Sequence, residues 1–221
     1  MNHRSSSRVA RALLGAAMLL AALGSCTVLP PREDATRYFV LSTNAPAGSA
    51  SSSGPETATS ASKTALASDP SFVVSVGPVR LPDYLLRPEI VRRAGENQLD
   101  PSPIDRWAEP IDRATQRVLA LDLAAAMPES TVIAFPSSPA QKIALEVAVE
   151  FARFEGSHAG AATLDARWTL RDLRTGNQVL RASRLERASS SEETSAMVAA
   201  MSGLLGDLSR EISREIGSLT R

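Results

Sequence analysis

Hydrophobic and polar residues alternate most regularly in the second half of the chain. Apolar residues occupy every second position in residues 143–151 and 164–170, and more weakly in 179–185, which follow the turn at 174–177. A period of two residues is typical of a strand with one buried and one solvated face. Because short turns join these runs, they predict an antiparallel meander of three strands.

Two other segments repeat at helical spacing. The first covers residues 111–127, where Pro110 precedes the first turn, Pro128 follows the last, and the recurring apolar positions are Ile111, Ala114, Val118, Leu121 and Ala125. The second has an apolar stripe made of Met197, Met201, Leu204, Leu208, Ile212, Ile216 and Leu219. Ser190 and Glu193 have capping-box spacing at its start.

The stripe of the second helix predicts packing on the sheet, and the open alternative is a face that docks a partner. A helix lying on a membrane would carry mostly Lys and Arg on its polar side, whereas this side mixes both signs.

Shorter patterns surround these elements. Residues 72–76 alternate as a strand that bends at Gly77-Pro78, the run around Ile90 and Val91 is a candidate partner strand, and 131–135 forms a short strand. The sequence YFVL at 38–41 indicates a first strand or a clip onto the domain, and the prolines in 100–103 predict a loop. Residues 42–70 are almost entirely Ser, Ala, Thr, Gly and Pro, which predicts a flexible segment.

The N-terminus has the pattern of an export signal. Arg4, Arg8 and Arg11 precede an apolar run at 12–23, which is too short to span a bilayer stably. The run ends in Leu-Gly-Ser-Cys at 23–26, similar to a bacterial lipobox, whose cysteine becomes lipidated. Cys26 is the only cysteine in the chain, which favours lipidation over the alternative of an ordinary cleaved signal. Thr27, where an Asp would signal inner-membrane retention, favours the periplasmic face of the outer membrane in a Gram-negative bacterium.

These elements predict an α+β fold, a single domain in which an antiparallel meander is covered by two amphipathic helices. The expected boundaries are a signal peptide at 1–25, the lipidated cysteine and a spacer at 26–35, a short strand plus the flexible segment at 36–71, and the α+β domain at 72–221.

Composition excludes several kinds of function. The 24 basic and 24 acidic residues balance, so no basic field for nucleic acid is expected. The single cysteine rules out an intrachain disulfide or a multi-cysteine metal site, and of the two histidines only His158, in a Gly/Ser turn, would remain after export. Neither a GxSxG nor a phosphate-binding glycine motif is present. We therefore expect no enzyme, no catalytic residue, no metal and no cofactor, and we interpret Trp107 and Trp168 as core or interface aromatics.

Five features occur in a characteristic order: the lipobox, YFVL, the segment VGPVRLPDYL, the block RWAEPIDRATQRVLALDL and the terminal amphipathic helix. Together they resemble the ABC-type transport auxiliary lipoproteins, the PqiC-like family. The resemblance covers most of residues 36–218, and its most specific parts are 79–85 and 107–111. The long segment at 42–70 departs from the family pattern.

This resemblance implies a non-enzymatic lipoprotein, anchored by N-terminal acyl chains, that docks or assists an ABC lipid transporter through its MCE-domain protein at the outer membrane. Some family members assemble as rings, so a homo-oligomer is left open. The alternative is a periplasmic module that carries phospholipid itself, which a closed apolar cavity would favour.

The candidate partner interface comprises Tyr84, Leu85 and Trp107, with the proline-bracketed segment 79–86 around the first two. The alternative is that these residues are ordinary core and turn.

Overall fold

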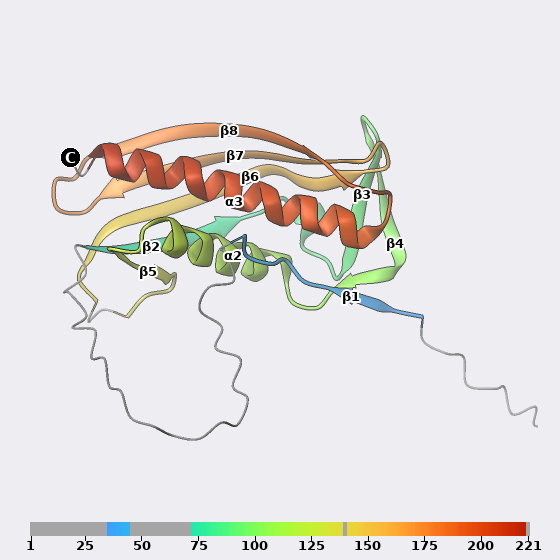
Figure 1. Cartoon of the computed structure of the whole chain (residues 1–221), viewed down its shortest axis with the longest axis horizontal. Helices are drawn as coiled ribbons and strands as arrows, with labels where there is room; N and C mark the ends of the chain where they lie inside the picture. The colour runs from blue at the N-terminus through green and yellow to red at the C-terminus, as the bar shows by residue number, and fades with distance from the viewer. Residues whose placement is uncertain (1–34, 45–71, 139–140, 220–221) are drawn as a thin grey trace, which may run out of the picture. The chain divides into compact units, whose positions relative to one another are not determined.

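The computed structural model describes residues 35–44, 72–138 and 141–219. Nearly all of them belong to one compact unit, Thr36–Arg221. The signal peptide, Cys26 and residues 45–70 of the Ser/Ala-rich segment lie outside the described residues, and what we expect of them stays a prediction. Within the described part, a mixed sheet is combined with two long helices, which confirms the α+β class (Figure 1).

The chain forms eight described strands, two long helices and one short 3-10 helix. They are β1 (Arg37–Phe39), β2 (Val73–Arg80), a short 3-10 helix η1 (Asp83–Leu85), β3 (Glu89–Gly95), β4 (Gln98–Trp107), α2 (Ile111–Ala126), β5 (Thr131–Ala134), β6 (Ile143–Ser157), β7 (Ala161–Asp172), β8 (Gln178–Ala188) and α3 (Thr194–Leu219).

The long strand β6 organises the sheet. On one side it pairs antiparallel with β7, which pairs antiparallel with β8, so the predicted meander is confirmed. On the other side it pairs in parallel with β2 and, at Gly156 and Ser157, with β3. Parallel pairs also join β2 to β5 and β1 to β4. The sheet is therefore mixed. Parallel neighbours need a long crossover connection, and between β2 and β5 the chain supplies one that includes α2.

Two local predictions were wrong. The prolines at 100–103 do not form a loop, because β4 runs through them. Along this stretch β3 is the only described neighbour of β4. A proline has no N–H, and on the side of the strand without a neighbour none is needed for the ladder. The run around Ile90 and Val91 does form a strand, β3, but it pairs with β4 and β6 rather than with β2.

Both helices lie on one face of the sheet, α3 along β6, β7 and β8 and α2 over β2 and β5, and they also contact each other (Figure 1). The stripe of α3 from Met197 to Ile216 is fully buried, so it packs on the sheet as predicted, and only Leu219 at its end is exposed. The helix begins at Thr194, directly after Glu193. The charged side of α3 faces β8, where Arg187 pairs with Asp207 and Arg181 with Glu215.

In α2 the buried face differs from the recurring positions that indicated the helix. Ile111, Ala114 and Val118 are buried, but Leu121 and Ala125 are exposed, while Leu119, Asp122 and Leu123 face inward. The sequence from 118 to 126 is apolar at nearly every position, so periodicity alone does not select one face there.

Candidate functional site

The described residues hold no candidate metal centre. Within 35–44, 72–138 and 141–219, no group of three or more His, Cys, Asp or Glu side chains is placed to hold a metal ion. His158 Nε2 lies 3.0 Å from Asp100 Oδ2, and both side chains are about half exposed, so this contact is a surface pair. None of the helices described is both long enough and apolar enough to span a bilayer. The candidate sites are therefore surfaces and grooves.

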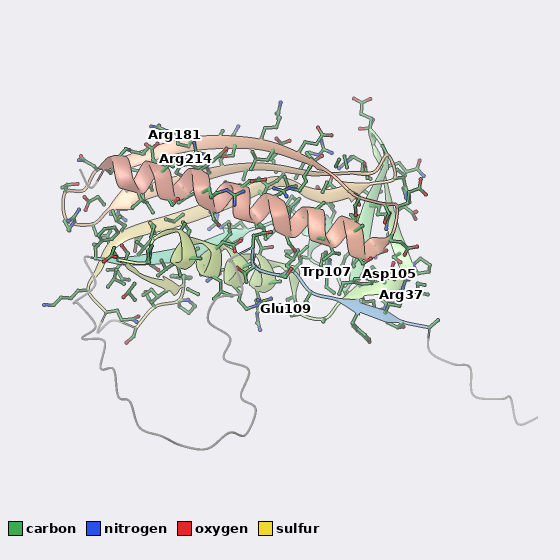
Figure 2. All side chains as sticks on the ribbon, in the orientation of Figure 1. Arg37, Asp105, Trp107, Glu109, Arg181 and Arg214 are labelled. Carbon is green, nitrogen blue, oxygen red and sulfur yellow. The ribbon has the colours of Figure 1, made fainter. Side chains whose placement is uncertain are left out.

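A buried carboxylate, Asp105, joins three elements at the β1 end of the domain (Figure 2). Arg37 of β1 donates from Nε to Oδ1 over 2.7 Å and from Nη2 to Oδ2 over 3.0 Å. Thr194, the first residue of α3, donates from Oγ1 to Oδ2 over 2.5 Å and accepts from Arg92 Nη2 over 2.9 Å. Burial raises the pKa of Asp105, but the hydrogen bonds from Arg37 and Thr194 outweigh it and hold the pKa below its ordinary value. The ionised carboxylate thus ties both the edge strand and the start of α3 to β4.

A second cluster surrounds the predicted interface residue Tyr84. Its hydroxyl donates to Glu155 Oε2 over 2.6 Å, and Arg93 Nε donates to Glu155 Oε1 over 2.6 Å. Arg153 reaches the same Oε1 at 3.3 Å. Burial, reinforced by the hydrogen bond to Glu155, raises the pKa of Tyr84 to about 12. The hydrogen bond of the Tyr84 hydroxyl therefore links η1 to β6.

The other two predicted interface residues are buried. Leu85 lies in the core, and Trp107 is 7% exposed. One edge of Trp107 lines a depression of about 380 Å³ that Leu86, Pro88, Ala108 and Pro110 share. Trp168 of β7 is buried as well and donates from Nε1 to Ser183 Oγ of β8 over 3.0 Å. Both tryptophans therefore belong to the core, and Trp107 also lines a surface recess.

The first residues of the Ser/Ala-rich segment are held on the helices. Ser42 N donates to Ser202 Oγ over 3.1 Å, and Asn44 Nδ2 donates to Ser202 O over 2.6 Å. Thr43 Oγ1 and Asn44 N both donate to the buried Asp122 Oδ1. The flexible segment predicted from residue 42 onward is therefore wrong for 42–44, because polar groups of α2 and α3 bind these residues.

A groove lies between α2 and the β2–β5 edge. Its volume is about 730 Å³. Its lining is apolar at Pro78, Val79, Ala120, Leu121, Ala124, Val132, Ala134, Phe135 and Pro136, and polar at Asp112, Arg113, Gln116 and Arg117 of α2. Leu121 and Phe135 are each nearly half exposed, so the groove opens to solvent and is not the closed cavity that a lipid carrier would favour.

Comparison with known proteins identifies this architecture. The family model described as "ABC-type transport auxiliary lipoprotein component" matches residues 55–213, well over half of the chain. The chain belongs to the ABC-type transport auxiliary lipoprotein family. This agrees with the resemblance seen in the sequence, and the family is not a class of enzymes. No protein of curated function matches the chain in sequence.

Two solved structures share the fold of this auxiliary lipoprotein. One, described as an uncharacterized protein, is 25% identical with a TM-score of 0.60, over 66% of this chain and 92% of its own. The other, protein XCC0632 from Xanthomonas campestris of family model DUF330, is 20% identical with a TM-score of 0.54, over 67% of this chain and 88% of its own.

Sequence reasoning missed the residues that organise the β1 end of the lipoprotein. Arg37, Asp105 and Thr194 occur singly in unrelated segments, and Arg37 and Asp105 are 68 residues apart. No local spacing connects them, so periodicity and motif searches carry no signal for this cluster.

Proposed function

We propose that this auxiliary lipoprotein is anchored by acyl chains on Cys26 at the periplasmic face of the outer membrane, where it docks or assists an ABC lipid transporter through an MCE-domain protein. The family match over residues 55–213 carries the transport-auxiliary part of this proposal. The lipobox-like Leu-Gly-Ser-Cys at 23–26 and the Thr at position 27 support the anchor and its location.

The described surface supports a positional role rather than a chemical one. Its buried polar groups Asp105 and Glu155 serve to join elements of the fold, as the contacts of Arg37 and Arg93 show. A domain of this kind contributes by presenting a binding face within reach of the membrane that holds its anchor. The recess beside Trp107, with Leu86 half exposed on its rim, is the part of the predicted interface that a partner can reach.

The alternative function, a module that itself carries phospholipid, is favoured by one observation, the apolar groove beside α2. A volume of about 730 Å³ is within the range of small-molecule sites. Lipid extraction from the purified mature protein distinguishes the two functions. Stoichiometric phospholipid in the wild type, lost when Leu121→Glu places a charge in the groove, would support the carrier function. Lipid-free wild-type protein would support the docking role.

Capture from the native envelope tests the docking role. A C-terminally tagged lipoprotein, isolated from detergent-solubilised membranes, should retain an MCE-domain protein, identified by mass spectrometry. Leu86→Glu should reduce its recovery several-fold, whereas Leu180→Glu, an equally exposed apolar position on β8, serves as the matched control. Absence of any MCE-domain protein from the wild-type sample would refute the proposed partner, and density fractionation of the two membranes tests the location.

A further inference from the structure

Exposed apolar side chains gather where the chain enters the domain. Tyr38 is 66% exposed and Val40 is 53% exposed at the edge strand β1 and just after it, and Ile104 of β4 is 38% exposed. Tyr38 lies opposite Arg106 in the parallel β1–β4 pair, so these two side chains share one face, and Ile104 is exposed on the same strand two residues before Arg106.

The cluster extends across the end of β4 to the recess beside Trp107. Ala108 N donates to Phe39 O over 2.9 Å, which places Val40 beside Ala108. Ala108 and Leu86 line the same recess, and Leu86 is 50% exposed. We call the surface formed by Tyr38, Val40 and Ile104 the entry patch, and it borders the recess that holds Leu86. It is located at the end of the domain where Figure 2 shows Arg37, Asp105 and Trp107, away from Arg181 and Arg214.

We infer that the entry patch rests on the bilayer surface and orients the domain on the membrane that holds its anchor. The inference rests on the proposed anchoring at Cys26. Only residues 27–36 separate Cys26 from β1, and a chain of this length spans at most about 40 Å when fully extended. The tether therefore keeps β1, of all described elements, nearest along the chain to the lipid.

The chemistry of the patch suits an interface rather than hydrocarbon. Tyrosine with aliphatic side chains is the combination that lies at headgroup level, where the ring is buried and the hydroxyl stays hydrated. Two arginines lie beside the patch. Arg106 lies opposite Tyr38 on the same face, Arg87 shares its partner Glu89, and both arginine side chains are partly exposed. Their remaining N–H groups can reach lipid phosphates.

The edge strand β1 also limits how deeply the patch can enter the membrane and which other partners could bind it. β1 pairs with β4 alone among the described strands, so its outer edge carries backbone groups that lack a ladder partner. Such groups are costly in hydrocarbon, which confines the contact to the hydrated interface. With three residues, β1 offers a partner protein too short a ladder for strand addition. A lipid surface is therefore the occupant that fits the entry patch best.

Depth-dependent fluorescence quenching tests this inference on the acylated full protein. The Tyr38→Trp variant is reconstituted in phosphatidylethanolamine/phosphatidylglycerol vesicles whose acyl chains carry bromine near the headgroups. The native Trp107 and Trp168 are buried, and the wild-type protein in the same vesicles measures their contribution. The matched control is Leu180→Trp, 61% exposed on β8 beside Arg181 at the opposite end of the domain.

We expect brominated lipid to quench the Tyr38→Trp reporter at least twofold and to leave Leu180→Trp unchanged. Replacing Val40 and Ile104 by Ser in the reporter background should remove most of this quenching without lowering the melting temperature. Equal quenching of the two reporters, or none, overturns the inference. The inference is also overturned if the fluorescence of the Tyr38→Trp reporter changes on self-association or on adding a protein partner but never on adding vesicles.

The intact mass of the mature protein separates this inference from the proposed anchor. If Cys26 is acylated and the reporter is not quenched, the anchor stands and the membrane contact is wrong. If Cys26 is unmodified, the protein is added to the same vesicles at high lipid concentration. Selective quenching of Tyr38→Trp then still supports the contact, and its absence refutes it.

Discussion

Arg37 and Asp105 hold β1 against β4 through a two-point ion pair in which the two residues lie directly opposite each other in the strand register. β1 has only three residues, and this pair fixes it together with Phe39, which packs against the core. Because β1 is the first described element after the proposed anchor, the pair connects the tether to the domain. Asp105 also receives the hydroxyl of Thr194, so the same carboxylate positions the start of α3.

Asp105→Asn should destabilise the domain by about 2–3 kcal/mol, because it removes the ionised acceptor of several hydrogen bonds at a buried position. Urea unfolding of the mature chain measures the change. The matched control is Asp100→Asn, whose carboxylate is more than half exposed and whose loss should cost less than ~0.5 kcal/mol. Equal effects of the two substitutions would contradict the role of Asp105.

The contribution of Asp105 should depend on pH. Its pKa in the folded protein lies below the ordinary value, because the bonds from Arg37 and Thr194 outweigh burial. The stabilisation is therefore complete above about pH 4, near the unfolded pKa, and is lost as the pH falls through the lower folded pKa. The stability difference between wild type and Asp105→Asn should shrink over that acidic range, and a constant difference would argue against an ionised Asp105.

Tyr84 should ionise with a pKa of about 12, because it is partly buried and donates to Glu155. Absorbance at the phenolate band during alkaline titration measures this, and Tyr84→Phe should remove that step. The stabilisation from the neutral hydroxyl is complete below pH 10, the ordinary pKa, and is lost as the pH rises toward 12. At neutral pH Tyr84→Phe should cost about 1 kcal/mol, and an alkaline step that survives it would show that the assignment is wrong.

Leu208→Ala should destabilise the domain by about 2–5 kcal/mol, because Leu208 is fully buried where α3 packs on the sheet. Thermal unfolding of the mature chain provides the measurement. Leu219→Ala, on the same stripe but partly exposed, should change stability by less than ~1 kcal/mol. An unchanged melting curve for Leu208→Ala, together with loss of partner capture, would instead indicate a docking face.

Cys26→Ala should abolish lipidation, since Cys26 is the only thiol in the chain and no other residue can form the thioether. Metabolic labelling with a fatty acid, followed by gel analysis, gives the result. We expect uncleaved precursor or untethered protein without label. Label retained on the Cys26→Ala protein would show attachment elsewhere.

Deleting residues 50–61 should leave the melting temperature almost unchanged. The deletion keeps Asn44, which binds Asp122, and Phe72, whose carbonyl accepts from Thr131 N. The cost of closing a loop changes slowly with its length, so a shorter connection alters stability little. A fall of many degrees would show that the removed residues pack on the domain.

The sequence by itself determined the elements whose patterns are local. The alternation in β6, β7 and β8 and the stripe of α3 follow from which side chains must leave water, and each pattern repeats within a few residues. The family was likewise readable from blocks such as 79–85 and 107–111, because a motif is a local string.

Only the tertiary structure decided how distant segments meet. Three features depend on contacts between residues far apart in the chain: the parallel pairing of β1 with β4, the strand through Pro101 and Pro103, and the burial of the Asp122 side chain. The same holds for Trp107, which sequence reasoning left as either a core or an interface aromatic and which the fold buries beside a recess. Burial is a property of the packed neighbours rather than of the residue type, so a lone Asp or Trp carries no sign of it until the chain has folded.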